Sequence, residues 1–99
     1  MEKQIIWTKP AIKDLQNIYE YYSEYSIQAA NKLVSNLHSQ TLNLLGSGNE
    51  NVGQIDEINI KYRRIIVGFY KILYRILENQ ILINRIFDCR QNPDILSKM

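Results

Sequence analysis

The chain is poor in the residues that usually signal secretion or redox chemistry, with one cysteine and one histidine among 99 residues. Because Cys89 is the only cysteine, an intrachain disulfide is excluded, and we expect a cytoplasmic location. No basic leader precedes an apolar core of signal-peptide length, and no uncharged run reaches the roughly 18 residues of a membrane helix. Secretion and membrane insertion are therefore disfavoured.

Motifs that carry chemistry are equally scarce. The glycine-rich segment 46–53 lacks the Gly-Lys-Ser/Thr ending of a phosphate-binding loop, so we expect a plain loop. His38 falls inside a predicted helix that offers no partner for proton transfer, which favours a surface or structural role over a catalytic one. Cys89 is favoured as a structural cysteine over an activated thiol, although Arg90 follows it directly. Neither a metal ion nor a cofactor is expected.

The charges of the chain are unevenly divided. Its length and its hydrophobic content of 45% suit one small domain over residues 1–99. Residues 1–58 carry four basic and seven acidic side chains, a net charge of −3, whereas residues 59–93 carry seven and two, a net charge of +5. All five arginines lie in the second segment: Arg63, Arg64, Arg75, Arg85 and Arg90. A soluble surface normally mixes both signs, so this segregation indicates an anionic partner, either nucleic acid or an acidic protein segment.

The first half of the chain predicts a strand followed by two helices. Residues 4–7 are β-prone, and Thr8 is placed to cap a helix that ends near residues 22–25. Ser26 is the predicted cap of a second helix, which stops at Gly46. Apolar side chains recur at three- and four-residue spacing in both, so the two helices should form an antiparallel hairpin. Four tyrosines surround the first helix instead of sharing one face: Tyr19, Tyr21, Tyr22 and Tyr25. Some of them must be exposed or contact another chain.

The second half predicts an antiparallel meander of three strands. Gly68 and residues 78–80 divide residues 62–93 into β-rich runs at the spacing of hairpin turns. A weaker alternating segment at residues 55–60 is either a short edge strand or a lead-in to the meander.

Alternation along the middle strand predicts which face of the sheet is covered. The side chains expected to face the helices are Tyr70, Ile72, Tyr74 and Ile76. Lys71 and Arg75 then lie on the opposite face, so we expect a sheet with one covered face and one basic face open to a partner. The alternation of the last strand is ambiguous and leaves Arg85 unassigned.

Two phrases, YRRIIVGFYKILYRI at residues 62–76 and RIFDCRQNP at residues 85–93, complete this pattern. With the order strand, two helices and meander, the chain resembles the RelE/ParE superfamily of bacterial type II toxin–antitoxin toxins over most of its length. The resemblance implies an α+β fold with an N-terminal strand, an antiparallel helical hairpin and an antiparallel three- to four-stranded meander. It also implies a cognate antitoxin, for which we predict an acidic, partly disordered binding segment.

The superfamily has two main activities. RelE-like members cut mRNA in the ribosome, whereas ParE-like members act on DNA gyrase without a complete nuclease site. By the resemblance, Lys71 stands where arginine is usual, and Arg90 stands where a basic residue stabilises charge on the scissile phosphate. The histidine common just before that position is missing, which leaves Asp88 as the candidate base. The catalytic candidates of the nuclease interpretation are thus Arg64, Lys71, Asp88 and Arg90.

The shortage of proton-transfer groups favours the ParE-like function, which is growth inhibition through DNA gyrase by the toxin of a plasmid-stabilisation module. Two alternatives stay open: a metal-independent, ribosome-dependent endoribonuclease, and a non-toxic relic that only binds its antitoxin. Either a homodimer or a toxin–antitoxin hetero-oligomer fits the family. The residues predicted to contact the target or a nucleic acid are Arg63, Arg64, Lys71, Arg75, Arg85 and Arg90.

Overall fold

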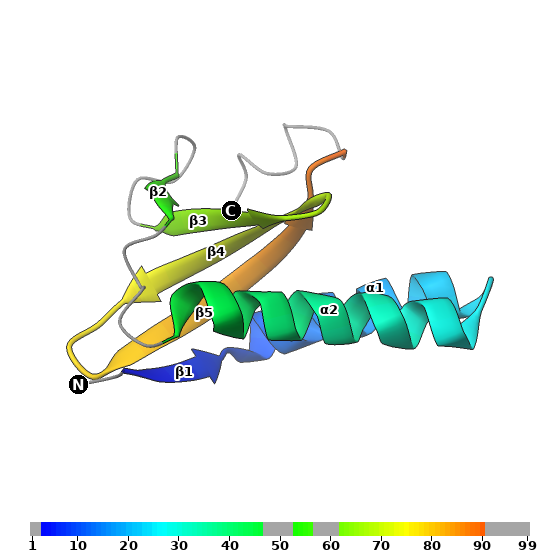
Figure 1. The fold of residues 1–99 in the computed structure, drawn as a ribbon, viewed down its shortest axis with the longest axis horizontal. Coiled ribbons are helices and arrows are strands. Elements are labelled where there is room, and N and C mark those ends of the chain that lie inside the picture. The colour runs from blue at the N-terminus through cyan, green and yellow to red at the C-terminus, as the bar shows by residue number, and fades with distance from the viewer. Residues whose placement is uncertain (1–2, 47–52, 57–61, 91–99) are drawn as a thin grey trace.

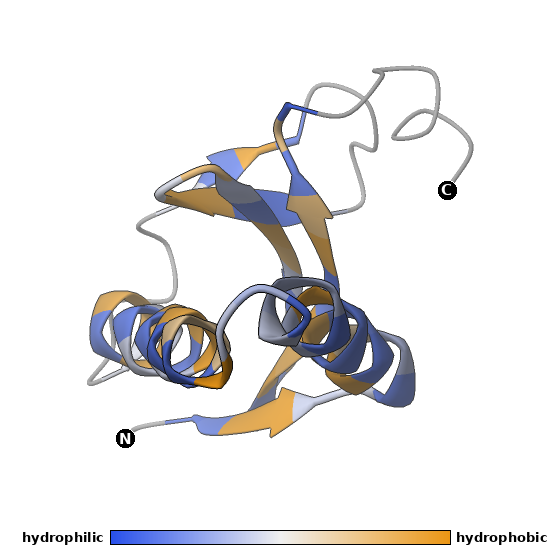
Figure 2. Cartoon of the chain, turned by 90° about the vertical axis from the view of Figure 1, so that its right-hand side faces the viewer, coloured by the Kyte–Doolittle hydropathy of each residue, from blue (hydrophilic) through white to orange (hydrophobic). Residues whose placement is uncertain are grey.

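A computed structural model describes residues 3–46, 53–56 and 62–90 and has the predicted α+β architecture (Figure 1). The elements follow the order β1 Gln4–Trp7, α1 Lys9–Ser23, α2 Ile27–Leu45, β2 Gln54–Ile55, β3 Arg63–Val67, β4 Tyr70–Ile76 and β5 Gln80–Asp88. Both helices lie on the same side of the twisted sheet, and they run antiparallel to each other (Figures 1 and 2).

Both helices begin where the capping signals predict. The Thr8 side chain accepts a hydrogen bond from the backbone N–H of Ala11, and the Ser26 side chain accepts one from Ala29. The Thr8 hydroxyl also donates to the carbonyl oxygen of Ile83 at 2.8 Å, so the start of α1 is fixed to β5. The predicted helical hairpin is confirmed.

The sheet contains the predicted meander and one pairing that the sequence did not place. Its strand order is β1-β5-β4-β3-β2, and β3, β4 and β5 pair antiparallel. The first strand joins the sheet parallel to β5, with Trp7 opposite Ile83, so the sheet is mixed. The weak segment at residues 55–60 begins with the last residue of a two-residue edge strand, β2, and its residues 57–60 lie outside the described residues. Most of the predicted loop at 46–53 lies outside them as well.

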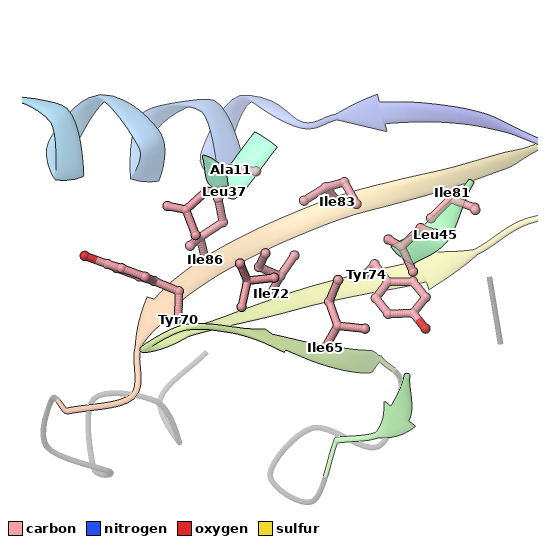
Figure 3. Packing of buried hydrophobic residues seen from close by; sticks show 11 residues of the cluster. Ala11, Leu37, Leu45, Ile65, Tyr70, Ile72, Tyr74, Ile81, Ile83 and Ile86 are labelled. Atoms are coloured by element: carbon pink, nitrogen blue, oxygen red, sulfur yellow. The ribbon is translucent and has the colours of Figure 1, made fainter. Parts of the chain in front are cut away.

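The core forms between the helices and the predicted face of the sheet (Figure 3). Tyr70, Ile72 and Tyr74 are buried there as expected, and Ile76 packs at the margin. Leu37 and Leu45 of α2 pack against the same cluster. The tyrosines of β4 are therefore core residues, as the alternation predicts.

A β-bulge explains the ambiguous alternation of the last strand. Leu73 pairs with Arg85 but Tyr74 pairs with Ile83, so Asn84 is an extra residue on β5. The insertion lets both Ile83 and Ile86 face the core although they are three residues apart. Arg85 is consequently placed on the outer face, opposite the buried Leu73.

Candidate functional site

The six basic residues predicted to contact a target do not share one surface. Arg63 lies on the helix side of the sheet, opposite Tyr74, and donates to the carbonyl oxygen of Gly53 at 2.8 Å. Arg64, Lys71 and Arg75 lie on the outer face of β3 and β4. The predicted placement of Lys71 and Arg75 on the face away from the helices is confirmed, but the cations of that face are not all open to solvent.

Lys71 is the clearest departure from that prediction. It is on the outer face, as expected, but it is buried with a relative accessibility of 7%. Its ammonium group donates to the carboxylate of Asp56 at 3.0 Å, and that carboxylate is itself only 2% accessible. Arg64 approaches the same oxygen, with Nη1 at 3.7 Å from Asp56 Oδ1. A buried ammonium requires such a partner, and the carboxylate just after β2 supplies it.

Arg85 starts on the outer side of β5, where pairing with β1 has ended, and its side chain reaches past this edge of the sheet to the first helix. Its Nε and Nη2 atoms donate to the carboxylate of Asp14 on α1 at 2.8 and 3.1 Å. The guanidinium also lies 5.0 Å from the centre of the Phe87 ring. Arg85 therefore links β5 to the helical hairpin.

Arg90, just after β5, is bound to the carboxylate of Asp88. Its Nη2 atom is 2.7 Å from Asp88 Oδ2 and also donates to the hydroxyl of Tyr22 at 3.1 Å. The guanidinium lies over the ring of Phe69, 4.6 Å from its centre. Hydrogen bonds from Arg90 lower the pKa of Asp88 below its ordinary value, which makes Asp88 a weaker proton acceptor.

Arg75 is the remaining residue of the six. It is exposed, and its guanidinium lies 5.9 Å from the centre of the Tyr62 ring. Within the three described segments it has no carboxylate partner.

A hollow of about 710 Å³ lies between the end of α1 and the end of β5. Arg85 and Arg90 both line it, and exposed Tyr21 and Tyr25 stand at its helical side. Tyr22 and Tyr70 both line it, and the neighbouring hydroxyl of Tyr70, together with the hydrogen bond from Arg90, lowers the pKa of Tyr22. Burial is the main cause of the raised pKa of Tyr70. We call this hollow the tyrosine pocket.

The sequence did not predict the tyrosine pocket, although it did single out the tyrosines of the first helix. The tyrosines that surround the first helix predicted exposure or contact with another chain, and Tyr21 and Tyr25 are indeed 58% and 75% accessible. The opposite wall comes from β5, more than 60 residues later, and nothing in the sequence brings the two together.

The remaining candidates carry no catalytic arrangement. His38 is exposed and stacks on Trp7 with ring centres 5.2 Å apart. Partial burial of the thiol raises the pKa of Cys89, which opposes its activation as a nucleophile. Within residues 3–46, 53–56 and 62–90, no cluster of His, Cys, Asp and Glu is arranged to hold a metal ion. Among the helices described, neither is long and apolar enough to cross a membrane.

Comparison with known proteins gives a consistent result. Residues 5–93 match the family model described as the ParE toxin of the type II toxin–antitoxin system parDE. A chain of the chromosomal ParDE toxin–antitoxin system from P. aeruginosa is 25% identical, with a TM-score of 0.78 over 87% of this chain and 95% of that chain. A chain of the RelBE2 toxin–antitoxin complex from Mycobacterium tuberculosis shares the fold, with 16% identity and a TM-score of 0.67 over 89% and 99% of the two chains. No curated protein sequence matches.

Proposed function

Because the chain belongs to the ParE toxin family of type II toxin–antitoxin systems, we propose that it arrests growth by binding a protein target, DNA gyrase, and not by cutting RNA. Its site of action is then the cytoplasm. A toxin of this kind needs a docking surface and no proton-transfer chemistry.

One observation carries this proposal: the cations needed for phosphate chemistry are already bound to carboxylates of the same chain. Lys71 is bound to Asp56, and Arg90 is bound to Asp88. Cleavage of RNA by its 2′-hydroxyl needs a base and an acid beside cations that face the scissile phosphate. Asp88, the candidate base, has a lowered pKa and holds Arg90 instead.

The test is supercoiling of relaxed plasmid by purified gyrase. The antitoxin-free protein is expected to inhibit supercoiling at near-stoichiometric concentrations. The same preparation should leave an unrelated type I topoisomerase active, which controls for binding to the DNA. Uninhibited gyrase at stoichiometric excess would rule the proposal out.

A ribosome-dependent endoribonuclease is the second candidate, favoured by the three cations that lie on the outer face of β3 and β4: Arg64, Lys71 and Arg75. If the cations of the outer face take part in cleavage, primer extension on mRNA after induction will show new 5′ ends within codons.

Inducing the chain alone separates both functions from a relic that only binds its antitoxin, because a relic leaves growth unimpaired.

We further propose that the antitoxin occupies the tyrosine pocket. Ile18 and Ile86 give it apolar walls, and Tyr21 stands exposed at its edge. Arg85 and Arg90 each use Nε and Nη2 in their bonds to the described residues, so Nη1 of each guanidinium can still donate. An apolar side chain next to a carboxylate fits this combination, and both occur in an acidic segment that folds on binding.

This docking proposal has a matched pair of variants. Tyr21→Ala removes an exposed ring at the pocket, whereas Ile12→Ala removes an exposed side chain of the same helix that does not line the pocket. Co-expression with the product of the neighbouring reading frame should give a complex that Tyr21→Ala weakens by about tenfold or more and Ile12→Ala leaves intact. Equal affinities of the two variants would exclude the pocket as the antitoxin site.

A further inference from the structure

The first strand, β1, forms an open border of the sheet. It ends the strand order β1-β5-β4-β3-β2, and in two perpendicular views no described element lies beyond it (Figures 1 and 2). An edge strand presents a row of backbone donors and acceptors with which another strand can pair. The edge of β1 is therefore a candidate interaction surface. It is separate from the tyrosine pocket, because β1 pairs with the start of β5 and the pocket lies at the end of β5.

The hydrogen bonds between β1 and β5 determine which backbone groups point outward. The N–H groups of Gln4 and Thr8 donate to carbonyl oxygens of this neighbouring segment at 3.2 and 3.1 Å. Backbone groups of every second residue point to the same side of a strand, so those of Lys3, Ile5 and Trp7 point to the open edge. Among the described residues, the N–H groups of Ile5 and Trp7 have no acceptor.

This edge carries none of the features that keep edge strands apart. The residues Gln4–Trp7 contain no charge and no proline, and their pairing with β5 has no bulge. His38 of α2 stacks on Trp7, and Leu42 follows one turn later on the same helix face with 36% of its surface exposed. Apolar surface therefore continues from the strand onto the helix beside it.

A second copy of the same strand fits this edge. In an antiparallel pair centred on Ile5, each Ile5 lies opposite the other, and Lys3 lies opposite Trp7 of the second copy. All of these residues point to the open edge, so each facing pair can exchange both of its backbone hydrogen bonds. A cation opposite an aromatic ring is a favourable cross-strand pair, and the two lysines lie at opposite ends. An acidic segment would find only Lys3 along this edge, so charge gives it no advantage over the second copy.

We propose that β1 is a self-association site: two copies of the chain pair their β1 strands antiparallel about Ile5 and join their five-stranded sheets into one. A strand of four residues buries less surface than a standard interface, so the dimer is weak and forms in the micromolar range. Both tyrosine pockets stay open, because they lie at the other end of β5. The dimer does not depend on the gyrase target or on the antitoxin.

The first test uses the native, antitoxin-free chain. Sedimentation velocity through the micromolar range should show a reversible equilibrium between monomer and dimer. Amide hydrogen exchange at Ile5 should slow by about tenfold where the dimer predominates, because its N–H gains an acceptor. Exchange at Ile6, which donates to β5 in both states, should change less. A chain that stays monomeric at the highest concentration, or one that dimerises with unchanged exchange at Ile5, would overturn the proposal.

A matched pair of double variants tests the register, in which Gln4 lies opposite Ile6 of the second copy. Gln4→Lys with Ile6→Lys places like charges opposite each other, whereas Gln4→Lys with Ile6→Glu places opposite charges there. Both variants put a long charged side chain at half-buried Ile6, so they share any loss of stability. The opposite-charge variant should dimerise about tenfold more tightly at equal ionic strength.

Antitoxin binding by the same two variants separates the second copy from the other possible occupant of the edge. The two variants should bind the antitoxin with equal affinity. Equal dimerisation of the two variants would overturn the proposal, and a difference in antitoxin affinity alone would assign this edge to the antitoxin instead.

Discussion

Asp14 of α1 and Arg85 of β5 are joined by two hydrogen bonds, although 71 positions separate them in the sequence. The same carboxylate accepts the backbone N–H of Ile86 at 2.8 Å. Pairing between β1 and β5 ends at Ile83, so Asp14 supplies an acceptor just beyond the point where the strand partner stops. One side chain therefore satisfies a strand edge and fixes the helical hairpin to the sheet.

The first prediction concerns this carboxylate. Asp14→Ala should lower the free energy of unfolding by about 2 kcal/mol, because the N–H of Ile86 loses its acceptor and the partly exposed Arg85 loses its partner. Asp14→Asn keeps an oxygen acceptor and should lose about half as much. Urea unfolding followed by Trp7 fluorescence measures both variants. Equal losses of unfolding free energy in the two variants would show that the hydrogen bond from the N–H of Ile86 contributes nothing to stability.

The second prediction concerns pH. Hydrogen bonds from Arg90 lower the pKa of Asp88 in the folded state. The stabilising contribution of the pair is therefore complete above the unfolded-state pKa of about 3.9, and it is lost as the pH falls through the lower folded-state value. Arg90→Gln should raise the NMR titration midpoint of the Asp88 carboxyl, and the stability difference from the native chain should vanish in stronger acid. A midpoint that stays in place would contradict the role of Arg90.

The third prediction compares two glycines that are required for different reasons. A side chain at Gly53 would collide with the carbonyl oxygen of Arg64, and Gly53 also donates its N–H to the hydroxyl of Tyr74 at 3.0 Å. Gly53→Ala should cost about 2 to 3 kcal/mol of stability through overpacking. Gly68 has a φ of +60° but open space around it, so Gly68→Ala should cost only about 1 kcal/mol of backbone strain. Denaturant unfolding of the two variants measures which substitution lowers the free energy of unfolding more. A larger loss for Gly68→Ala than for Gly53→Ala would contradict the packing argument.

The features that sequence predicts well are those that a few neighbouring residues determine. Thr8 and Ser26 cap their helices through side chains that reach only three residues ahead, and Gly68 turns a hairpin through its own φ. The bulge at Asn84 depends on how β5 pairs with β4, so the alternation of β5 alone leaves the position of Arg85 open.

The candidate site shows the same limit. The sequence identifies Lys71 and Arg90 as cations, and basic side chains do outnumber acidic ones in the second half of the chain. The fold determines which carboxylate a cation binds. Lys71 binds Asp56 from the segment after β2, and Arg85 binds Asp14 from α1. A charge count along the chain therefore overestimates the positive surface that a partner meets.

The last prediction uses Arg75, which is exposed and has no carboxylate partner in the described part of the chain. Arg75→Ala should change the free energy of unfolding by less than about 0.5 kcal/mol, because the guanidinium touches only the ring of Tyr62 there. If the outer face meets gyrase, the variant should inhibit supercoiling about threefold to tenfold more weakly, as expected for an exposed charge at the rim of an interface. Arg63→Ala is the control, because Arg63 lies on the helix side and donates to Gly53; it should lower stability by about 1 kcal/mol. Arg75→Ala that inhibits as strongly as the native chain would place the gyrase contact away from this face.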